Sequence, residues 1–588
     1  MGHMRKLIVA GVSALAMVLC VPGIALASSA PTIQVTSTPT QGVGLPITAP
    51  QSATARPPGF TSDAAQAVTA SEQNKTMIAL HAREHPLAYR PLIWNDQYWL
   101  VDFSYAGKLV AQVTVSSAGH LTGVWTGALA SAPYARGDFI TQFGAWWVLV
   151  PFSLLFLLPF LDLRRPRRML HVDALVLLSF LISYLLFDHA KLVAAVWMVY
   201  PPLLYLLVRM LWMGGLRFPG LRERGRRVAK RSAAIGTRTE GLSPLLSVRV
   251  LAIGLVALVI ARIALSLATH LVIDVGYASV IGAHRIAAGQ PIYYAGANHG
   301  DTYGPIAYLA YLPFELLFPW HGTWDYLPSA HAASIVFDLV TVVGLVLLGR
   351  QLRGGREGWR LGLALGWAWS ACPFTLLALM AHSNDGLVAM LSVLSLVAFT
   401  SPAARGALLG LAAAAKFAPA ALLGLYAGQR NRGIKGTIIC LASFTVIVVT
   451  SIALYLPSGG LAEFYNHTIG YQLSRSDVFS AWALHPSLDP IKTALELGAL
   501  VLAALVAFVP RQRSIAQICA LAGAVTIALQ LPAVHWFYYF IVWFMPFVLV
   551  AMLAGTGDDG GAVDAAETVV APPATADERS LEIVHAGV

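Results

Sequence analysis

Isolated acids and bases beside apolar segments are the residues of this sequence that could do chemistry. In the stretch HLVIDVGYASVIGAHRIAAGQPIY, Asp274 follows a long apolar segment and precedes a Tyr, a single Arg and a Gly-Gln-Pro turn. A carboxylate in this place is either the solvated charge of a helix end or a general base that removes a proton from a hydroxyl group. Asp274 alone does not decide between these two interpretations.

Other isolated polar residues recur between the apolar segments. Many of them lie in AHSNDGL, in FYNHTIGYQLSRSDVFSAWALHP and in PAVHWFYYF, and one lysine interrupts the apolar residues 404–426. An ionisable group at membrane depth is costly unless it faces a polar cavity, so each of these is a candidate. Besides Asp274, the candidate site residues are Tyr303, Glu315, His382, Asp385, Lys416, Arg475, His485 and His535.

Carboxylates combined with a lone Lys and a lone Arg have a coherent chemical use. A general base such as Asp274 can deprotonate an acceptor hydroxyl, while Lys416 or Arg475 stabilises the charge that develops on a phosphate leaving group. These are the needs of sugar transfer from a lipid-phosphate donor, whose tail stays in the bilayer while its head group enters a cavity. The elements that carry these residues must therefore bring them to one side of a membrane.

The composition identifies the chain as a polytopic helical membrane protein. Of its 588 residues, 57% are hydrophobic and 12% are charged, and the mean hydropathy is +0.67, whereas a soluble domain has about 25% charged residues. Apolar runs of about 20 residues are long enough to cross a bilayer. The net charge of +10 comes from Arg and Lys clusters between these runs, as in cytoplasmic loops, so we expect no nucleic-acid partner. The four cysteines are isolated and indicate no disulfide framework.

The first 140 residues divide into three predicted parts. Residues 1–27 have a basic start, a short apolar core and an Ala-x-Ala end, which is typical of a signal peptide. Residues 28–60 are predicted to be a Ser/Thr/Pro-rich linker. Residues 61–140 are predicted to form a small extracytoplasmic α+β domain, with a polar helix over 61–84 and then a three-stranded meander whose apolar and polar residues alternate.

The distribution of charge predicts the topology of the remaining chain. Residues 141–248 are predicted to hold three spans and a basic cytoplasmic loop, residues 249–555 the main transmembrane module, and residues 556–588 a disordered acidic cytoplasmic tail. The predicted spans are 141–161, 169–187, 191–213, 249–271, 328–349, 361–381, 386–400, 437–456, 491–509, 515–532 and 536–553. This arrangement puts every multi-Arg cluster inside and the candidate residues outside.

Two further apolar segments are predicted not to cross the membrane. Residues 303–320 contain two prolines and Glu315 and are rich in Tyr and Trp, so we expect them to lie in the outer interface. Residues 404–426 are expected to be a short re-entrant hairpin with Lys416 near its outer tip. With either segment as a full span, flanking arginines would fall outside.

Five segments, taken in order, resemble the GT-C-fold polyprenyl-phosphate-dependent glycosyltransferases. The closest resemblance is to glycosyltransferase family 87, which includes polyprenyl-phosphomannose-dependent mannosyltransferases, and it covers roughly residues 250–553. The segments are DVGYASVIGAHRIAAGQPIY with YGPIAYLAYLPFELLFP, GRQLRGGREGWRLGLALGWAWSACPFTLLALMAHSNDGL, GALLGLAAAAKFAPAALL, FYNHTIGYQLSRSDVFSAW and HWFYYFIVWFMP. Residues 61–140 resemble PepSY-type extracytoplasmic modules.

The resemblance implies a mainly α, GT-C-type transmembrane bundle and an inverting glycosyltransferase of the plasma membrane that uses no cofactor. Asp274 would be the general base, and Lys416 and Arg475 would contact the donor phosphate. Asp385 matches a second acid whose usual acidic partner is replaced by Asn384, so no metal is expected. The other residues implied in substrate binding are Tyr303, Glu315, His382, His485 and His535. The donor would be a polyprenyl-phosphate-linked sugar, mannose-like or arabinose-like, and the acceptor a glycan or glycolipid of the envelope.

Two other functions stay open at this point. A transporter or flippase of lipid-linked intermediates would also need a polar cavity and basic residues, although the sequence lacks the paired discontinuous segments of inverted repeats. A non-catalytic membrane sensor would use the outer α+β domain as its receiving part. The substitution Asp274→Asn separates these functions, because it should abolish transfer by an enzyme and leave a sensor largely unaffected.

Overall fold

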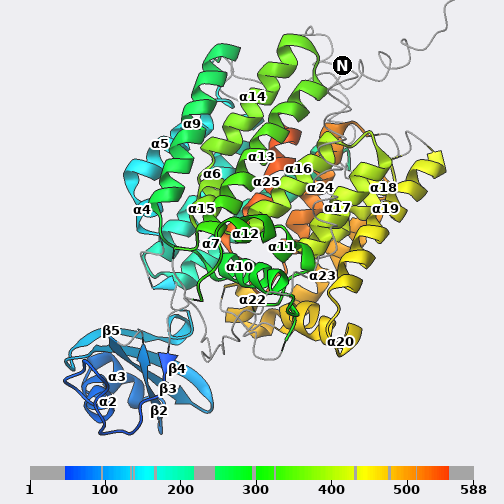
Figure 1. Cartoon of the computed structure of the whole chain (residues 1–588). Helices are drawn as coiled ribbons and strands as arrows, with labels where there is room; N and C mark the ends of the chain where they lie inside the picture. The colour runs from blue at the N-terminus through cyan, green and yellow to red at the C-terminus, as the bar shows by residue number, and fades with distance from the viewer. Residues whose placement is uncertain are drawn as a thin grey trace, which may run out of the picture.

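The chain folds as a helical bundle with a small sheet domain at one end (Figure 1). The computed structural model describes residues 47–94, 97–132, 135–136, 140–163, 168–216, 246–294, 300–322, 326–429, 433–474, 479–510 and 513–554. The predicted signal peptide and acidic tail lie outside the described residues, as do the first part of the predicted linker and Arg475. The architecture confirms the predicted class, a mainly α polytopic protein with a small N-terminal α+β domain.

The N-terminal domain is an antiparallel sheet covered on one face by two helices. Its strands, in spatial order, are β1 (Ile47–Thr48), β2 (Ala88–Trp94), β3 (Tyr98–Tyr105), β4 (Lys108–Ser116) and β5 (Leu121–Thr126), and its helices are α2 (Ala64–Glu72) and α3 (Lys75–His81). Alternate residues of a strand point to opposite faces, and in β3 this buries Trp99, Val101 and Phe103 completely in the cluster that includes Met77 of α3.

This domain corrects two details of the sequence prediction. The sequence predicts one helix and three strands, whereas the structure has two helices and five strands. The helical stretch is broken because the side chain of Asn74 caps a new helix, accepting a hydrogen bond from the Thr76 N–H at 2.9 Å. Sequence reasoning misses β2 because Pro91 interrupts its pattern and a proline argues against a strand, and it misses β1 because that strand has only two residues.

The remaining described residues build the membrane bundle. Five of their helices are long and apolar enough to cross a membrane, or six if the bent pair α14 and α15 is one span. The helices are α4 (Thr141–Gly144), α5 (Trp146–Leu157), α6 (Met169–Asp188), α7 (Leu192–Met213), α9 (Val248–Ala268), α13 (Pro328–Leu352), α14 (Gly355–Ala371), α15 (Pro373–Met380), α16 (Asp385–Val397), α17 (Pro402–Ala415), η4 (Ala418–Leu422), α18 (Leu423–Ala427), α19 (Gly433–Leu454), α23 (Asp489–Leu505), α24 (Ile515–Gln530) and α25 (Ile541–Ala554).

Short elements gather at the end of the bundle that carries the sheet domain (Figure 1). They include α10 (Asp274–Ala287), α11 (Pro305–Leu309), α12 (Leu312–Leu317), α20 (Gly460–Tyr465) and α22 (Ala481–Leu484). A further short element, η8 (Tyr538–Phe540), directly precedes α25. The apolar segment 303–320 becomes α11 and α12, which are too short to cross a membrane, as predicted. The turn between α13 and α14, with Arg353 and Arg356, lies at the opposite end.

The helices α5, α6 and α7 are packed into the same core as the rest of the bundle. The hydroxyl groups of Ser183 in α6 and Tyr538 in η8 lie 2.8 Å apart. The indole N–H of Trp367 in α14 donates to the Leu155 carbonyl of α5 at 2.8 Å. These helices, which lie outside the family resemblance, therefore support elements that lie inside it.

The segment 402–427 is a hairpin with Lys416 at its turn. A Cβ added at Gly406 would lie 2.2 Å from the Cys440 carbonyl oxygen, and one at Gly410 would lie 3.0 Å from that of Phe444, so α17 and α19 pack closely and run parallel. The chain must return through η4 and α18 to begin α19, and the Thr437 hydroxyl donates to the Ala427 carbonyl where they meet. The chain thus turns back at Lys416, where the sequence predicts a hairpin turn.

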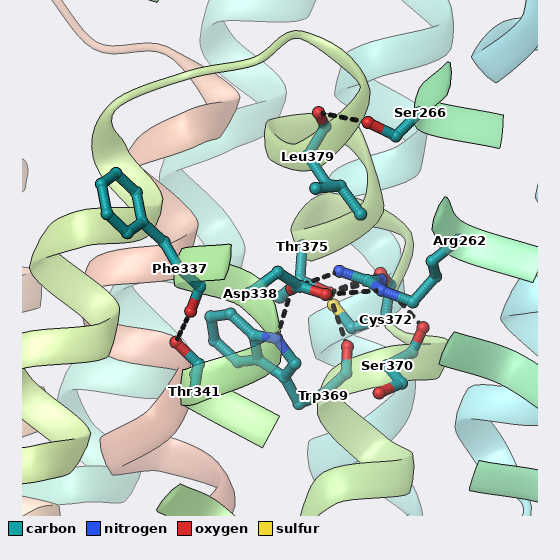
Figure 2. A network of polar contacts seen from close by, with 10 residues as sticks. All are labelled: Arg262, Ser266, Phe337, Asp338, Thr341, Trp369, Ser370, Cys372, Thr375 and Leu379. Atoms are coloured by element: carbon teal, nitrogen blue, oxygen red, sulfur yellow. Dashed lines mark hydrogen bonds and ion pairs between the residues drawn. The ribbon is translucent and has the colours of Figure 1, made fainter. Parts of the chain in front are cut away.

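A buried ion pair fixes the 59° bend between α14 and α15 (Figure 2). Arg262 of α9 is fully buried and donates to both carboxylate oxygens of Asp338, at 2.7 and 3.2 Å. It also donates to the Ser370 carbonyl at 2.9 Å and to the Thr375 hydroxyl at 3.2 Å, while the Trp369 indole donates to Asp338. Arg262 therefore provides a hydrogen bond to the Ser370 carbonyl, which the bend leaves without a partner in the helix. After the bend, α15 leads the chain into the interior of the bundle.

Candidate active site

Asp385 and Lys416 form a buried ion pair at the centre of the candidate site. Asp385 is the first residue of α16, Lys416 follows the last residue of α17, and the Lys416 ammonium donates to Oδ1 of Asp385. The same oxygen accepts from the indole N–H of Trp543 at 2.8 Å, and the Ser383 hydroxyl donates to Oδ2. Both charged side chains are more than nine-tenths buried. The Trp543 hydrogen bond links the start of α16 and the end of α17 to α25.

Helix geometry explains why these two charges lie together. α16 and α17 are adjacent and antiparallel, so Asp385 lies at a helix N-terminus and Lys416 at a helix C-terminus, where the helix dipoles favour an anion and a cation respectively. With 13 residues, α16 rises about 20 Å, which is less than the bilayer's hydrocarbon core of about 30 Å. The sequence places AHSNDGL in an external turn, whereas residues 381–385 are buried in the bundle.

The first loop of the module packs directly on the Lys416 turn. The Gly304 N–H donates to the Ala415 carbonyl at 3.2 Å, and a Cβ at Gly304 would lie only 2.0 Å from the Ala414 carbonyl oxygen. The Tyr303 ring centroid lies 4.9 Å from the Lys416 ammonium nitrogen, within the range of a cation–π contact. Tyr303, predicted to bind substrate, therefore lies in the Asp385–Lys416 site, and glycine is required beside it.

Asp274 lies at the start of a helix that packs on the turn leading to Asp385. It is the first residue of α10, its side chain is exposed, and its carboxylate accepts from the Val275 N–H at 2.9 Å. A Cβ added at Gly276 of α10 would lie 2.4 Å from the His382 carbonyl oxygen, so the first turn of α10 is in close contact with this turn. Within the described part of the chain no cation pairs with Asp274, which leaves its carboxylate available to accept a proton.

The turn before α16 holds α10 in place through His382 and Asn384. His382 donates from Nδ1 to the Leu271 carbonyl at 2.7 Å, and its Nε2 lies 3.1 Å from the Ser266 hydroxyl. The Asn384 amide donates to the Ser279 hydroxyl of α10 at 3.0 Å. A backbone hydrogen bond of 3.2 Å from Ile273 to the Ala381 carbonyl completes the connection. His382 is thus placed to position Asp274 through the backbone of residues 271–273.

The burial of His382 predicts that stability falls at acidic pH. Desolvation lowers the pKa of His382 from its usual 6.5 to about 4. Between these values the unfolded chain binds the proton and the folded chain does not, so stability is full above pH 6.5 and is lost as the pH falls toward 4. The difference corresponds to about 3 kcal/mol. Thermal unfolding in detergent at pH 7.5 and 4.5 measures this loss.

The matched variants for this measurement are His382→Asn and His485→Asn. His382 has a φ of 52°, a left-handed conformation that Asn tolerates better than most residues. We expect the pH dependence to shrink in His382→Asn and to stay unchanged in His485→Asn, because His485 is exposed. An unchanged pH dependence in His382→Asn would show that this histidine does not control it.

Three of the other predicted residues, Glu315, His485 and His535, have described contacts with residues other than the Asp385–Lys416 pair. Glu315 is buried and accepts at one oxygen from the Trp320 N–H at 2.7 Å, with the His284 ring nitrogen at 3.0 Å, so its described contacts join α12 to α10. The ring of His485 packs on Trp197 of α7 at 5.8 Å between centroids. The ring of His535 packs against Phe479 at 5.5 Å and Phe540 at 6.1 Å. Arg475 lies outside the described residues.

Sequence reasoning misses two residues that the fold adds to the site. Ser383 and Trp543 hydrogen-bond the Asp385 carboxylate. The available signal for Ser383 was its position two residues before Asp385. Within the described residues, no three His, Cys, Asp or Glu side chains come together so as to hold a metal ion.

Comparison with known proteins relates part of the chain to a family of enzymes. Residues 302–551 match the model of glycosyltransferase family 87, and this range contains Tyr303, Asp385, Lys416 and Trp543 but begins after Asp274. No curated protein matches the chain. The chain is thus a multi-pass membrane protein in which residues 302–551 are similar to glycosyltransferase family 87.

Proposed function

We propose that the chain transfers a mannose-like or arabinose-like sugar from a polyprenyl-phosphate donor to a glycan or glycolipid of the cell envelope. The observation that carries the proposal is the combination of an exposed carboxylate, Asp274, with the buried lysine of the Asp385–Lys416 pair, at one end of a glycosyltransferase bundle. Asp274 supplies a base that can deprotonate an acceptor hydroxyl. Lys416 supplies a positive charge that can bind the donor phosphate.

The proposed reaction is a direct displacement at the anomeric carbon. The acceptor oxygen attacks this carbon while the Asp274 carboxylate takes its proton. The bond between the anomeric carbon and the phosphate oxygen breaks, the electron pair leaves with the polyprenyl phosphate, and the configuration inverts. Lys416, together with Arg475, stabilises the charge on the departing phosphate.

The ion pair with Asp385 is compatible with this role of Lys416. A lysine ammonium has three donors, and Asp385 is its hydrogen-bond acceptor among the described residues. The rings of Tyr303 and Trp543, at 4.9 and 5.5 Å, stabilise the charge without accepting a conventional hydrogen bond. The lysine is therefore held charged and oriented before a phosphate oxygen binds.

We further propose that the reaction takes place on the extracytoplasmic face of the plasma membrane. The Arg-rich turn between α13 and α14 lies at the end opposite to α10 and the sheet domain, and Arg-rich loops are retained on the cytoplasmic side. A polyprenyl-phosphate donor suits this face because its tail anchors the sugar in the bilayer.

The test of this function is transfer of radiolabelled sugar by the purified chain. The donors are polyprenyl-phosphate sugars, with nucleotide sugars as the control donors, and the acceptor is an extract of envelope glycolipids. We expect label to enter the glycolipid from a polyprenyl-phosphate donor only. Absence of transfer from every such donor would refute the proposal, and movement of intact donor across vesicles without a product would identify a flippase instead.

A further inference from the structure

An acid and a histidine that are far apart in the sequence form a second buried pair. Nδ1 of His467 lies 2.6 Å from Oδ2 of Asp301, within hydrogen-bond distance, and Nε2 of the same ring lies 3.8 Å from Oε1 of Glu463. Only 5% of the Asp301 side chain is exposed, and a buried carboxylate is costly unless it is paired and hydrogen-bonded. The Asp301–His467 pair therefore compensates a charge that the fold takes out of water.

The helix that carries His467 changes its hydrogen-bond pattern at this residue. α20 is followed without a break by one π-helical turn, η6 (Asn466–Gly470), and then by α21 (Tyr471–Ser474). π-Helical turns are rare and are frequently found at functional sites. Arg475, a proposed phosphate contact, follows α21 directly in the sequence, so the helix with this unusual turn leads into the donor side of the site.

The Asp301–His467 pair is connected to Tyr303, the residue beside Lys416. The His467 ring packs on Tyr293 at 6.2 Å between centroids, and the Tyr293 hydroxyl donates to the Tyr303 carbonyl at 2.8 Å. Asp301 itself precedes Tyr303 by two residues. The pair thus fixes Tyr303 both through the chain and through the Tyr293 ring, and the Tyr303 ring lies 4.9 Å from the Lys416 ammonium nitrogen.

The chain around α10 is therefore attached to the bundle at two separate places. His382 holds the Leu271 carbonyl before α10, near Asp274. The Asp301–His467 pair holds the chain before α11, near Tyr303. Because the two attachments use different elements, loss of the pair should displace Tyr303 and leave Asp274 in place.

We infer that the Asp301–His467 pair positions Tyr303 against Lys416 and thereby sets the affinity of the site for the donor phosphate. The inference rests on the proposed function and adds two positioning residues to its donor side. The family match assigns no role to either residue. Asp301 and His467 act through Tyr303 and Lys416, and their own contact with a substrate is not required.

The first test removes the pair in the full-length chain and measures kcat and the apparent KM for each substrate. Radiolabelled polyprenyl-phosphate mannose and an envelope glycolipid extract are titrated separately. We expect His467→Leu to raise the apparent KM for the donor about 10-fold, the effect of one lost hydrogen bond to a charged group, and to leave the acceptor KM unchanged. Asp301→Leu combined with His467→Leu removes the pair without leaving a buried charge and should raise the donor KM equally, so the test does not depend on the folding of the single variant.

Two further variants identify the contact that matters. His467→Asn should stay within about threefold of the wild type, because the Asn amide nitrogen can donate to Asp301 from near the position of Nδ1. Glu463→Gln is the control and should show wild-type kinetics, because Glu463 is partly exposed and its distance of 3.8 Å from His467 indicates a weak pair.

A second test asks whether the pair acts through Tyr303. The Asp301→Leu, His467→Leu change is repeated in a Tyr303→Ala background, where it should raise the donor KM by less than about twofold, because residues that act through one another are not additive. A pair that only stabilised the fold would have the same effect in both backgrounds.

Four outcomes would overturn the inference. They are an unchanged donor KM when the pair is removed, an equal rise in the acceptor KM, full additivity with Tyr303→Ala, and a donor KM in His467→Asn as high as in His467→Leu, which would mean that His467 contacts the donor itself. In all four cases the wild-type chain still transfers sugar, so the proposed function stands. If the wild-type chain forms no product, the proposed function fails and the inference fails with it.

Discussion

Replacing Asp274 with Asn is expected to lower the rate of sugar transfer about 100- to 10,000-fold, the usual contribution of a general base. The amide has nearly the same shape as the carboxylate and its oxygen can still accept from the Val275 N–H, so α10 should begin at the same residue. Donor binding should persist, because the proposed phosphate contacts come from Lys416 and Arg475. Transfer and donor binding are measured on the same purified protein.

Asp489→Asn is the matched control for this substitution. Asp489 is likewise an exposed acid at the first position of a helix, α23, but it has no proposed role. We expect it to transfer sugar at the wild-type rate. A rate for Asp274→Asn within about twofold of this control would rule out Asp274 as the base, since base removal is worth at least about 100-fold.

The second large effect concerns the stability of the buried ion pair. Replacing Lys416 with Met is expected to destabilise the protein by about 3–5 kcal/mol, because Asp385 is left as an uncompensated charge inside the bundle. Lys492→Met is the control: Lys492 and Glu496 form a partly exposed pair at 3.8 Å, and such pairs contribute at most about 1 kcal/mol. Unfolding in detergent micelles measures the loss of stability in Lys416→Met and in Lys492→Met.

The double variant Asp385→Asn with Lys416→Met separates folding from function. It removes both charges together, and such replacements of a buried pair are often nearly neutral in stability. We therefore expect it to regain most of the lost stability but to transfer sugar far more slowly than the wild type, because Lys416 no longer faces the donor phosphate. An equally stable Lys416→Met variant would contradict the burial argument, and an active double variant would contradict the phosphate role of Lys416.

Part of the arrangement of the bundle could be predicted from the sequence, because the distribution of charge constrains it. Keeping the arginine clusters on one side predicts that Asp274 lies at the other end, that residues 303–320 do not form a full span, and that Lys416 lies at a hairpin turn. The structure has the sheet domain and α10 at one end and the Arg-rich turn at the other.

The internal arrangement of the site was not accessible from the sequence. Asp385 and Lys416 are 31 residues apart, and their pairing depends on two helices that are shorter than a full span. The inward course of AHSNDGL depends on the bend that Arg262 and Asp338 fix from distant positions.

Glu315 shows the converse case, a residue whose pattern suggested chemistry and whose contacts are structural. A carboxylate in an apolar interfacial segment is as conspicuous in the sequence as Asp274. The fold buries it and uses one oxygen to hold Trp320 and His284, so it joins α12 to α10. Exposure and hydrogen-bond partners, which a sequence does not specify, separate the two acids.

The most direct test of the whole account is sugar transfer by the full-length chain in sealed proteoliposomes that contain a radiolabelled polyprenyl-phosphate sugar. A membrane-impermeant glycan acceptor is added outside, and protease digestion of the sheet domain reports the fraction of molecules that face outward. The account predicts that product forms in proportion to this outward fraction and disappears in Asp274→Asn. Product that forms in proportion to the inward-facing fraction, or equally in Asp274→Asn, would contradict it.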